Sequence, residues 1–83
     1  MTQAADDVAV QAWCMDYLAR VLRRPADGID PAATFSDLGV DSAEMLFMVS
    51  ALEDRWRLDL ASDVPLDYPT VLALSRYIAG LMA

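Results

Sequence analysis

The chain has 83 residues, of which 57% are hydrophobic, and this length predicts one small domain with a modest buried core. It carries 13 acidic residues against six arginines, giving a net charge of −7, and has neither lysine nor histidine. These absences exclude serine–histidine and cysteine–histidine nucleophile pairs, imidazole metal sites and phosphate-loop lysines, while the acidity argues against nucleic acid and anionic membranes as partners.

The first predicted element is a helix from about Asp6 to Leu22, which stops before Pro25. Its apolar residues recur at helical spacing and predict one buried stripe: Val10, Trp13, Cys14, Tyr17, Leu18 and Val21. Arginines gather at its end, where positive charge suits the helix dipole. Cys14 is the one cysteine, so no internal disulfide forms, and its apolar neighbours predict a buried thiol in a reducing compartment.

A connection of 17 residues runs from Pro25 to Asp41 and contains two prolines and two glycines. Connections of this length inside a small domain are usually either functional or disordered. Here the apolar residues Ile29, Phe35 and Leu38 recur at wide spacing. They predict an ordered loop that is anchored on the core.

The second predicted helix runs from about Ser42 to Arg57. Five apolar residues share one face of it: Met45, Met48, Val49, Leu52 and Trp56. Phe47 falls on the opposite side, in the direction of Asp54. The pattern leaves two interpretations of Phe47: it packs against the long loop, or it is an exposed anchor for a partner protein.

Prolines between Leu58 and Pro69 leave room for one short helical turn at most. Thr70 is the expected N-cap of a last helix, which ends near residues 80–81. Its apolar face contains Val71, Leu74, Ile78 and Leu81. We therefore predict an all-α fold for residues 1–83, a single domain in which three longer helices and one short helix form a four-helix bundle.

The most informative residues are Asp41 and Ser42, which stand where the second helix begins. Either side chain can cap the free backbone N–H groups of that helix. A helix N-terminus also favours a bound negative charge, so a serine with an outward hydroxyl is well placed to carry a phosphodiester.

The run from Leu38 to Ser42, Leu-Gly-Val-Asp-Ser, resembles the attachment motif of the acyl carrier protein family. Leu52-Glu53 is similar to that family's helix-two ending, and the segment from Asp67 to Thr70 resembles carriers of polyketide and nonribosomal peptide pathways. The resemblance implies that a phosphopantetheinyl transferase moves phosphopantetheine from coenzyme A onto Ser42. The arm's thiol then holds acyl groups as thioesters, and the carrier itself is not an enzyme.

The resemblance also implies a partner-recognition surface on and before the second helix. Its expected members are Asp41, Ala43, Glu44, Phe47, Ser50 and Asp54. Ala43 replaces a larger apolar residue of the family, and Phe47 stands where fatty-acid carriers usually have glutamate. Val40 stands where peptidyl carriers usually have a second glycine. These departures favour a polyketide-type acyl carrier, with fatty-acid and peptidyl carriers, or an unmodified helical interaction module, as alternatives.

Family members of the fatty-acid type hold the acyl chain between their helices. The residues expected to line such a cavity here, if they are not ordinary core packing, are Leu46, Met48, Val49, Leu74 and Ile78. Residues 37–67 carry a net charge of −6, which predicts an acidic surface that binds basic partner proteins. The partners that the resemblance implies are a ketosynthase, an acyltransferase and the phosphopantetheinyl transferase. No secretory leader is visible, so we expect a protein of the cytoplasm. A monomer is the default expectation for its oligomeric state.

Overall fold

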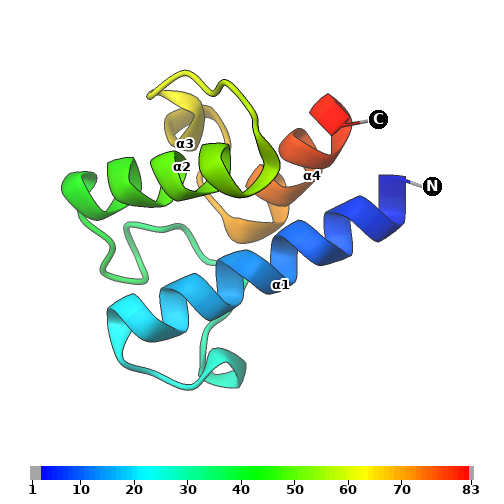
Figure 1. Cartoon of the computed structure of the whole chain (residues 1–83). Coiled ribbons are helices and arrows are strands. Elements are labelled where there is room, and N and C mark those ends of the chain that lie inside the picture. Colours follow the sequence, from blue (N-terminus) through cyan, green and yellow to red (C-terminus); the bar gives the residue numbers. More distant parts are fainter. Residues whose placement is uncertain (1–2, 83) are drawn as a thin grey trace.

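Four helices follow one another along the chain: α1 (Gln3–Leu22), α2 (Ser42–Trp56), α3 (Val64–Asp67) and α4 (Val71–Met82). The structure is a computed structural model that describes the backbone of residues 3–82 and the side chains of residues 7–82, so residues 1, 2 and 83 of the predicted domain lie outside it. Figure 1 shows three long helices and one short one. Within residues 3–82 there is no β-strand, so the predicted all-α fold is confirmed.

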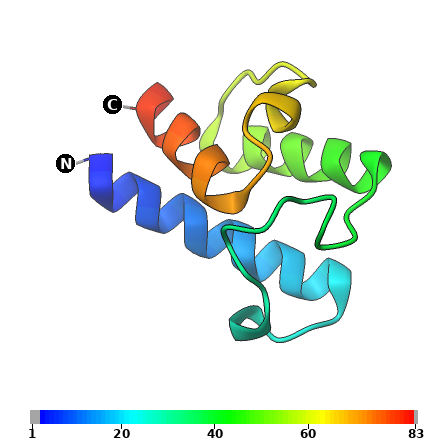
Figure 2. The same ribbon diagram turned by 180° about the vertical axis from the view of Figure 1, so that it is seen from behind.

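One core joins the three long helices and the long loop. α1 packs along α4, and both ribbon views show α2 lying across them (Figures 1 and 2). The side chains that the three helices bury most deeply are Val10, Cys14, Leu18, Met48, Leu52, Val71, Leu74 and Ile78. They lie on the apolar faces that the 3.6-residue period predicts, but Leu81, expected on the apolar face of α4, is 47% exposed. Trp13 and Tyr17 stack at 5.2 Å between ring centroids, and Trp56 meets Trp13 edge-on at 5.8 Å, which ties α1 to α2.

The long loop is ordered, as its apolar spacing predicts. Ile29, Phe35, Leu38 and Val40 are all buried against the core. A 3₁₀ turn, η1 (Ala26–Gly28), lies inside the loop and was not predicted. The loop is also tied to the last helix, because the Leu72 N–H donates to the Pro31 carbonyl at 3.1 Å, and to the segment before that helix, because the Phe35 N–H donates to the Pro69 carbonyl at 2.9 Å.

The helix boundaries differ slightly from the predicted ones. α1 already includes Gln3, three residues before its expected start, and α4 extends to Met82. α2 ends at Trp56, because Arg57 takes a left-handed conformation with φ 55°. Pro65 lies in the first turn of α3, where a missing N–H costs no helical hydrogen bond. Thr70 caps α4 as expected, since its hydroxyl accepts from the Ala73 N–H at 3.1 Å.

α2 begins on the side of the molecule away from both ends of the described chain (Figures 1 and 2). Across residues 3–82, no helix combines the length and apolarity that crossing a membrane requires.

Candidate functional site

Ser42 is the first residue of α2, and it is exposed. The cap of this helix is Asp41, whose Oδ1 accepts from the Glu44 N–H at 2.8 Å. Glu44 closes the other half of a capping box, since its Oε1 accepts from the Asp41 N–H at 3.3 Å. Of the two capping candidates, Asp41 therefore caps the helix, and the Ser42 hydroxyl is not part of the cap.

The turn that leads into Asp41 is closed by its own backbone. The Leu38 N–H donates to the Thr34 carbonyl at 3.0 Å, and the Val40 N–H donates to the Phe35 carbonyl at 2.9 Å. Between them Gly39 has φ +89°, a conformation that residues with a Cβ avoid. The chain thus reaches Ser42 from a turn whose shape depends on glycine at position 39.

We expect Gly39→Ala to lower the free energy of unfolding by about 1–2 kcal/mol, the cost of an L side chain at positive φ. A Cβ at Gly39 meets no atom within 4 Å, so the cost is one of backbone conformation and not of collision. Urea unfolding measures it. Gly28→Ala is the matched control, because Gly28 also has open space but no positive φ, and it should be neutral or slightly stabilising. Equal stability of the two variants would contradict this reading of the turn.

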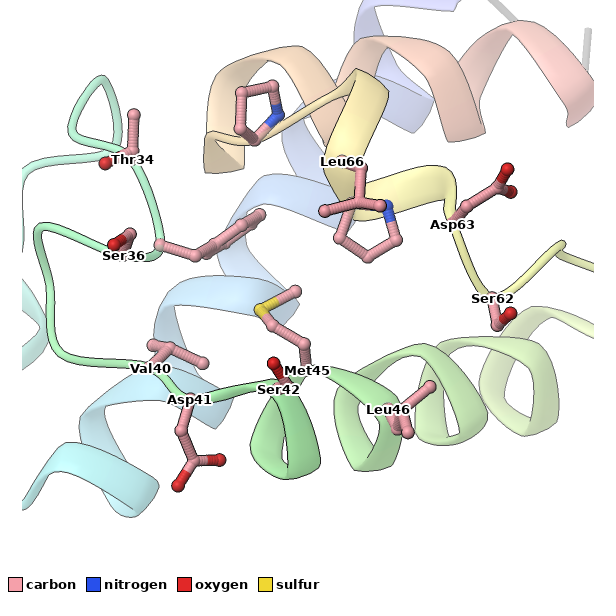
Figure 3. Close-up of a pocket in the computed structure, with 13 residues that line it drawn as sticks. Thr34, Ser36, Val40, Asp41, Ser42, Met45, Leu46, Ser62, Asp63 and Leu66 are labelled. Carbon is pink, nitrogen blue, oxygen red and sulfur yellow. The ribbon is translucent and has the colours of Figure 1, made fainter.

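A pocket of about 510 Å³ opens beside Ser42, between the first turns of α2, the long loop and α3 (Figure 3). Its wall combines apolar and polar side chains: Thr34, Phe35, Ser36, Val40, Asp41, Ser42, Met45, Leu46, Ser62, Asp63, Pro65, Leu66 and Pro69. Figure 3 shows Leu66 on α3 facing Met45 and Ser42 across the opening, with Thr34 and Ser36 to one side. A mixed wall of this kind suits a flexible ligand that alternates methylene and amide groups.

The five predicted cavity residues do not lie together on this wall. Leu46 lines the pocket and is 53% exposed. The other four, Met48, Val49, Leu74 and Ile78, are buried in the packed core. The pocket wall is thus drawn mainly from residues outside the predicted set, such as Met45 and the α3 residue Leu66.

The predicted partner surface is placed as follows. Asp41, Ala43, Phe47, Ser50 and Asp54 are exposed, whereas Glu44 is half-buried and bound into the capping box. Phe47 is 69% exposed, so the interpretation that it packs against the long loop is wrong. Its role as a partner anchor stays a prediction.

Sequence reasoning missed Leu66, which is 82% exposed on α3 and lines the pocket. Leu46 and Leu66 both line the pocket, whereas Phe47 does not; we call these three large exposed apolar side chains of α2 and α3 the apolar rim. The signal available in the sequence was an isolated leucine between Pro65 and Asp67 in a segment too short to have a buried face of its own.

The remaining reactive group is Cys14, which lies in the core and away from the pocket. It is fully buried, and this burial raises the pKa of its thiol from 9.0 to about 12. The thiol is therefore protonated at neutral pH and unreactive. Among the described residues, no group of three metal-ligating side chains comes together.

The raised pKa of Cys14 predicts a loss of stability in alkali. The unfolded chain releases this proton above pH 9 and the folded chain near pH 12, so the unfolding free energy falls across that window. From pH 8 to pH 10 the Cys14 contribution is about 1.4 kcal/mol. Urea unfolding at both pH values should show the wild type losing that much more than Cys14→Ala. The same pH dependence in both proteins would contradict the prediction.

Comparison with known proteins bears on this site directly. A family model described as "Phosphopantetheine attachment site" matches residues 13–78. Polyketide synthase PksM of Bacillus subtilis is 31% identical over 74 residues, which are 89% of this chain and 2% of that protein. Norsolorinic acid synthase of Dothistroma septosporum is 39% identical over 56 residues, 65% of this chain and 2% of that protein. The chain spans only 2% to 4% of the length of the curated relatives that it matches.

Solved structures show the same fold. A free-standing peptidyl carrier protein from an Acinetobacter baumannii secondary metabolic pathway matches with a TM-score of 0.88 at 31% identity, over 94% of this chain and 98% of that chain. The HMG-ACPI domain of the CurA module from Lyngbya majuscula matches with a TM-score of 0.78 at 30% identity, over 87% and 73% of the two chains. The chain therefore belongs to the phosphopantetheine attachment-site family, non-catalytic carrier proteins that bear a covalently attached phosphopantetheine.

Proposed function

We propose that Ser42 carries the phosphopantetheine and that the chain, as one carrier domain over residues 1–83, presents acyl intermediates to polyketide-type enzymes. The observation that carries the proposal is the position of Ser42. Its side chain is exposed at the start of α2 and faces a pocket, while Asp41 supplies the helix cap. The polyketide synthases among its relatives support the choice of pathway.

The residues present fit the group. The N-terminus of α2 favours the negative charge of a phosphodiester on Ser42. In loading, the bond from Ser42 Oγ to phosphorus forms as the phosphorus–oxygen bond to adenosine 3′,5′-bisphosphate breaks, and the hydroxyl proton passes to a base of the transferase. When bound, the arm supplies a thiol that holds acyl groups as thioesters.

The pocket beside Ser42 is the proposed resting place for the part of the arm nearest the protein. Phe35, Val40 and Met45 offer apolar contact, while Ser36 and Ser62 offer hydroxyls to amide groups. The core residues below are fully packed, with Met48 and Leu74 both at 0% exposure. We therefore propose that cargo at the far end of the arm stays outside the helical core, and that of the cavity residues expected from the sequence only Leu46 contributes, as part of the pocket wall.

The proposed partners are a phosphopantetheinyl transferase, a ketosynthase and an acyltransferase, which a monomeric carrier meets in the cytoplasm. The apolar rim and the acidic residues around it form the proposed docking surface, with Asp41, Glu44, Ser50 and Asp54 at its charged and polar positions and the small Ala43 between them. Glu44 contributes there through the capping box as well as through its charge.

A peptidyl carrier is the second candidate, because one matching structure is a free-standing peptidyl carrier protein. Val40, in place of the glycine usual in that class, favours the acyl carrier. Its side chain is buried and forms part of the pocket wall, so it also shapes the site.

The test is intact-mass spectrometry after incubation with coenzyme A and a broad-specificity phosphopantetheinyl transferase. A mass gain of one phosphopantetheine is expected. Holo protein should then accept a malonyl unit from a polyketide acyltransferase and no amino acid from an adenylation domain. An unchanged mass would instead support an unmodified interaction module, and aminoacylation alone would support the peptidyl carrier.

A further inference from the structure

Arg24 joins the end of α1 to the turn that presents Ser42. Its Nη2 donates to the Leu38 carbonyl at 2.9 Å, across 14 residues of sequence and in a partly buried position. Both ribbon views show the end of α1 beside the loop that leads into α2 (Figures 1 and 2). Nothing in the family motif marks this residue, since Arg24 precedes the long loop altogether.

The end of α1 is built so that Arg24 points back towards the loop. Arg23 adopts a left-handed conformation with φ 56°, and the Arg24 N–H donates to the Ala19 carbonyl at 3.0 Å. This is the Schellman arrangement, in which a left-handed residue closes the helix. Glycine is usual at the left-handed position, so an arginine there carries a conformational cost. The backbone of Arg24 is therefore fixed before its side chain reaches the loop.

The peptide unit that Arg24 holds is the one that sets the conformation of Gly39. Its carbonyl, from Leu38, accepts from Arg24, and its N–H, from Gly39, donates to the Ser36 carbonyl at 3.0 Å. Both ends of this peptide plane are thus held. The following peptide unit is held as well, because the Val40 N–H donates to the Phe35 carbonyl at 2.9 Å. Since φ of Gly39 is the rotation about the N–Cα bond next to the first plane, these hydrogen bonds together hold the +89° turn. Two residues later the chain reaches Asp41, the cap of α2.

We infer that Arg24 is a positioning residue for the loading reaction: by holding the Leu38 carbonyl it keeps the turn, and with it Ser42, in the geometry that the transferase uses. This inference rests on the proposed function of Ser42. The guanidinium is the right donor for the task, because a charge-assisted hydrogen bond is stronger than a neutral one. Arg24 is exposed, so in a variant without the guanidinium a water molecule can donate to the Leu38 carbonyl in its place. The expected effect of such a variant on loading is therefore moderate.

The test compares loading kinetics of Arg24→Met, Arg24→Lys and Arg20→Met with the wild type, using coenzyme A and one transferase. Arg24→Met should lower kcat/KM for the carrier about fivefold through kcat, since a misplaced hydroxyl slows transfer without removing the docking surface. Arg24→Lys, which keeps a donor, should stay within about twofold of the wild type. Arg20→Met removes the same charge from the exposed end of α1 and should load normally.

A second readout separates positioning from general stability. Amide hydrogen exchange of Gly39 and Val40 should accelerate in Arg24→Met and return towards wild-type values in Arg24→Lys. Three results would overturn the inference: unchanged loading by Arg24→Met, a loss equal in Arg24→Lys or Arg20→Met, or a rise in KM alone, which would indicate direct contact with the transferase. A wild type that takes no arm would overturn the proposed function of Ser42 instead.

Discussion

Ser42→Ala is expected to abolish the gain of phosphopantetheine completely, because no other hydroxyl has its position. The matched control is Ser36→Ala, which removes another exposed serine from the wall of the same pocket. Ser36 lies within the long loop, where no long-helix N-terminus is available to favour a phosphodiester. Intact-mass spectra of both variants after treatment with coenzyme A and the transferase give the comparison.

The two variants should fold equally well, because Asp41 and not Ser42 caps α2. Their helical circular dichroism and urea midpoints should match the wild type. Loss of loading in both variants, or in neither, would contradict the assignment of Ser42, since only a general disturbance of the pocket or a different attachment residue produces those patterns.

Phe47→Glu is expected to weaken docking of a polyketide acyltransferase about thirtyfold, seen as a rise in the KM for holo carrier. Phe47 is a large aromatic that is 69% exposed on the proposed docking surface, so we treat it as a candidate interface hot spot, and hot spots contribute about 2 kcal/mol or more. Placing a carboxylate in an apolar pocket of the partner adds a desolvation cost to the lost contact. The free carrier should lose no stability, because Phe47 covers no part of its own core.

The control for Phe47→Glu is Val8→Glu on α1. Val8 is 67% exposed, so both variants replace a solvent-facing apolar side chain by the same charge. Val8→Glu should leave the KM within about twofold of the wild type, as expected for a surface charge distant from the contact. Equal effects of the two variants would show that net charge, and not the apolar rim, governs docking.

The helices and their buried faces could be predicted from the sequence because they depend on local rules. The period of apolar residues predicts burial of Met48, Val49 and Leu52, and it also predicts that Phe47 points away from the core. The structure adds the choice between the two capping candidates at the start of α2. Either side chain has the chemistry, and only the observed hydrogen bonds decide for Asp41.

The left-handed residues that close α1 and α2 were not predicted, because the usual sequence signal for them is missing. Arg23 and Arg57 both take left-handed conformations in which glycine is the expected residue. The Leu58 N–H nevertheless donates to the Glu53 carbonyl at 3.0 Å, so α2 closes in the usual way. At both positions the helix-closing backbone hydrogen bond forms although the left-handed residue is an arginine.

The pocket could not be predicted from periodicity, because its wall comes from three separate segments. α3 has four residues and no face of its own to reveal a pattern, so the inward and outward directions of Val64 and Leu66 follow from where α3 packs. Predicting the cavity from the second and fourth helices alone selected core residues such as Leu74. The hydrogen bond from Arg24 to the Leu38 carbonyl could not be predicted either, because a side chain to backbone bond between residues 14 apart produces no sequence pattern.

Fragmentation of the holo protein by tandem mass spectrometry tests the central claim most directly, because it reports which side chain bears the arm. Four serines lie in or near the site, at positions 36, 42, 50 and 62. The account predicts a phosphopantetheine on Ser42 alone, with the other three unmodified. An arm found on any other residue, or fully active transferase that leaves every serine unmodified, would contradict it.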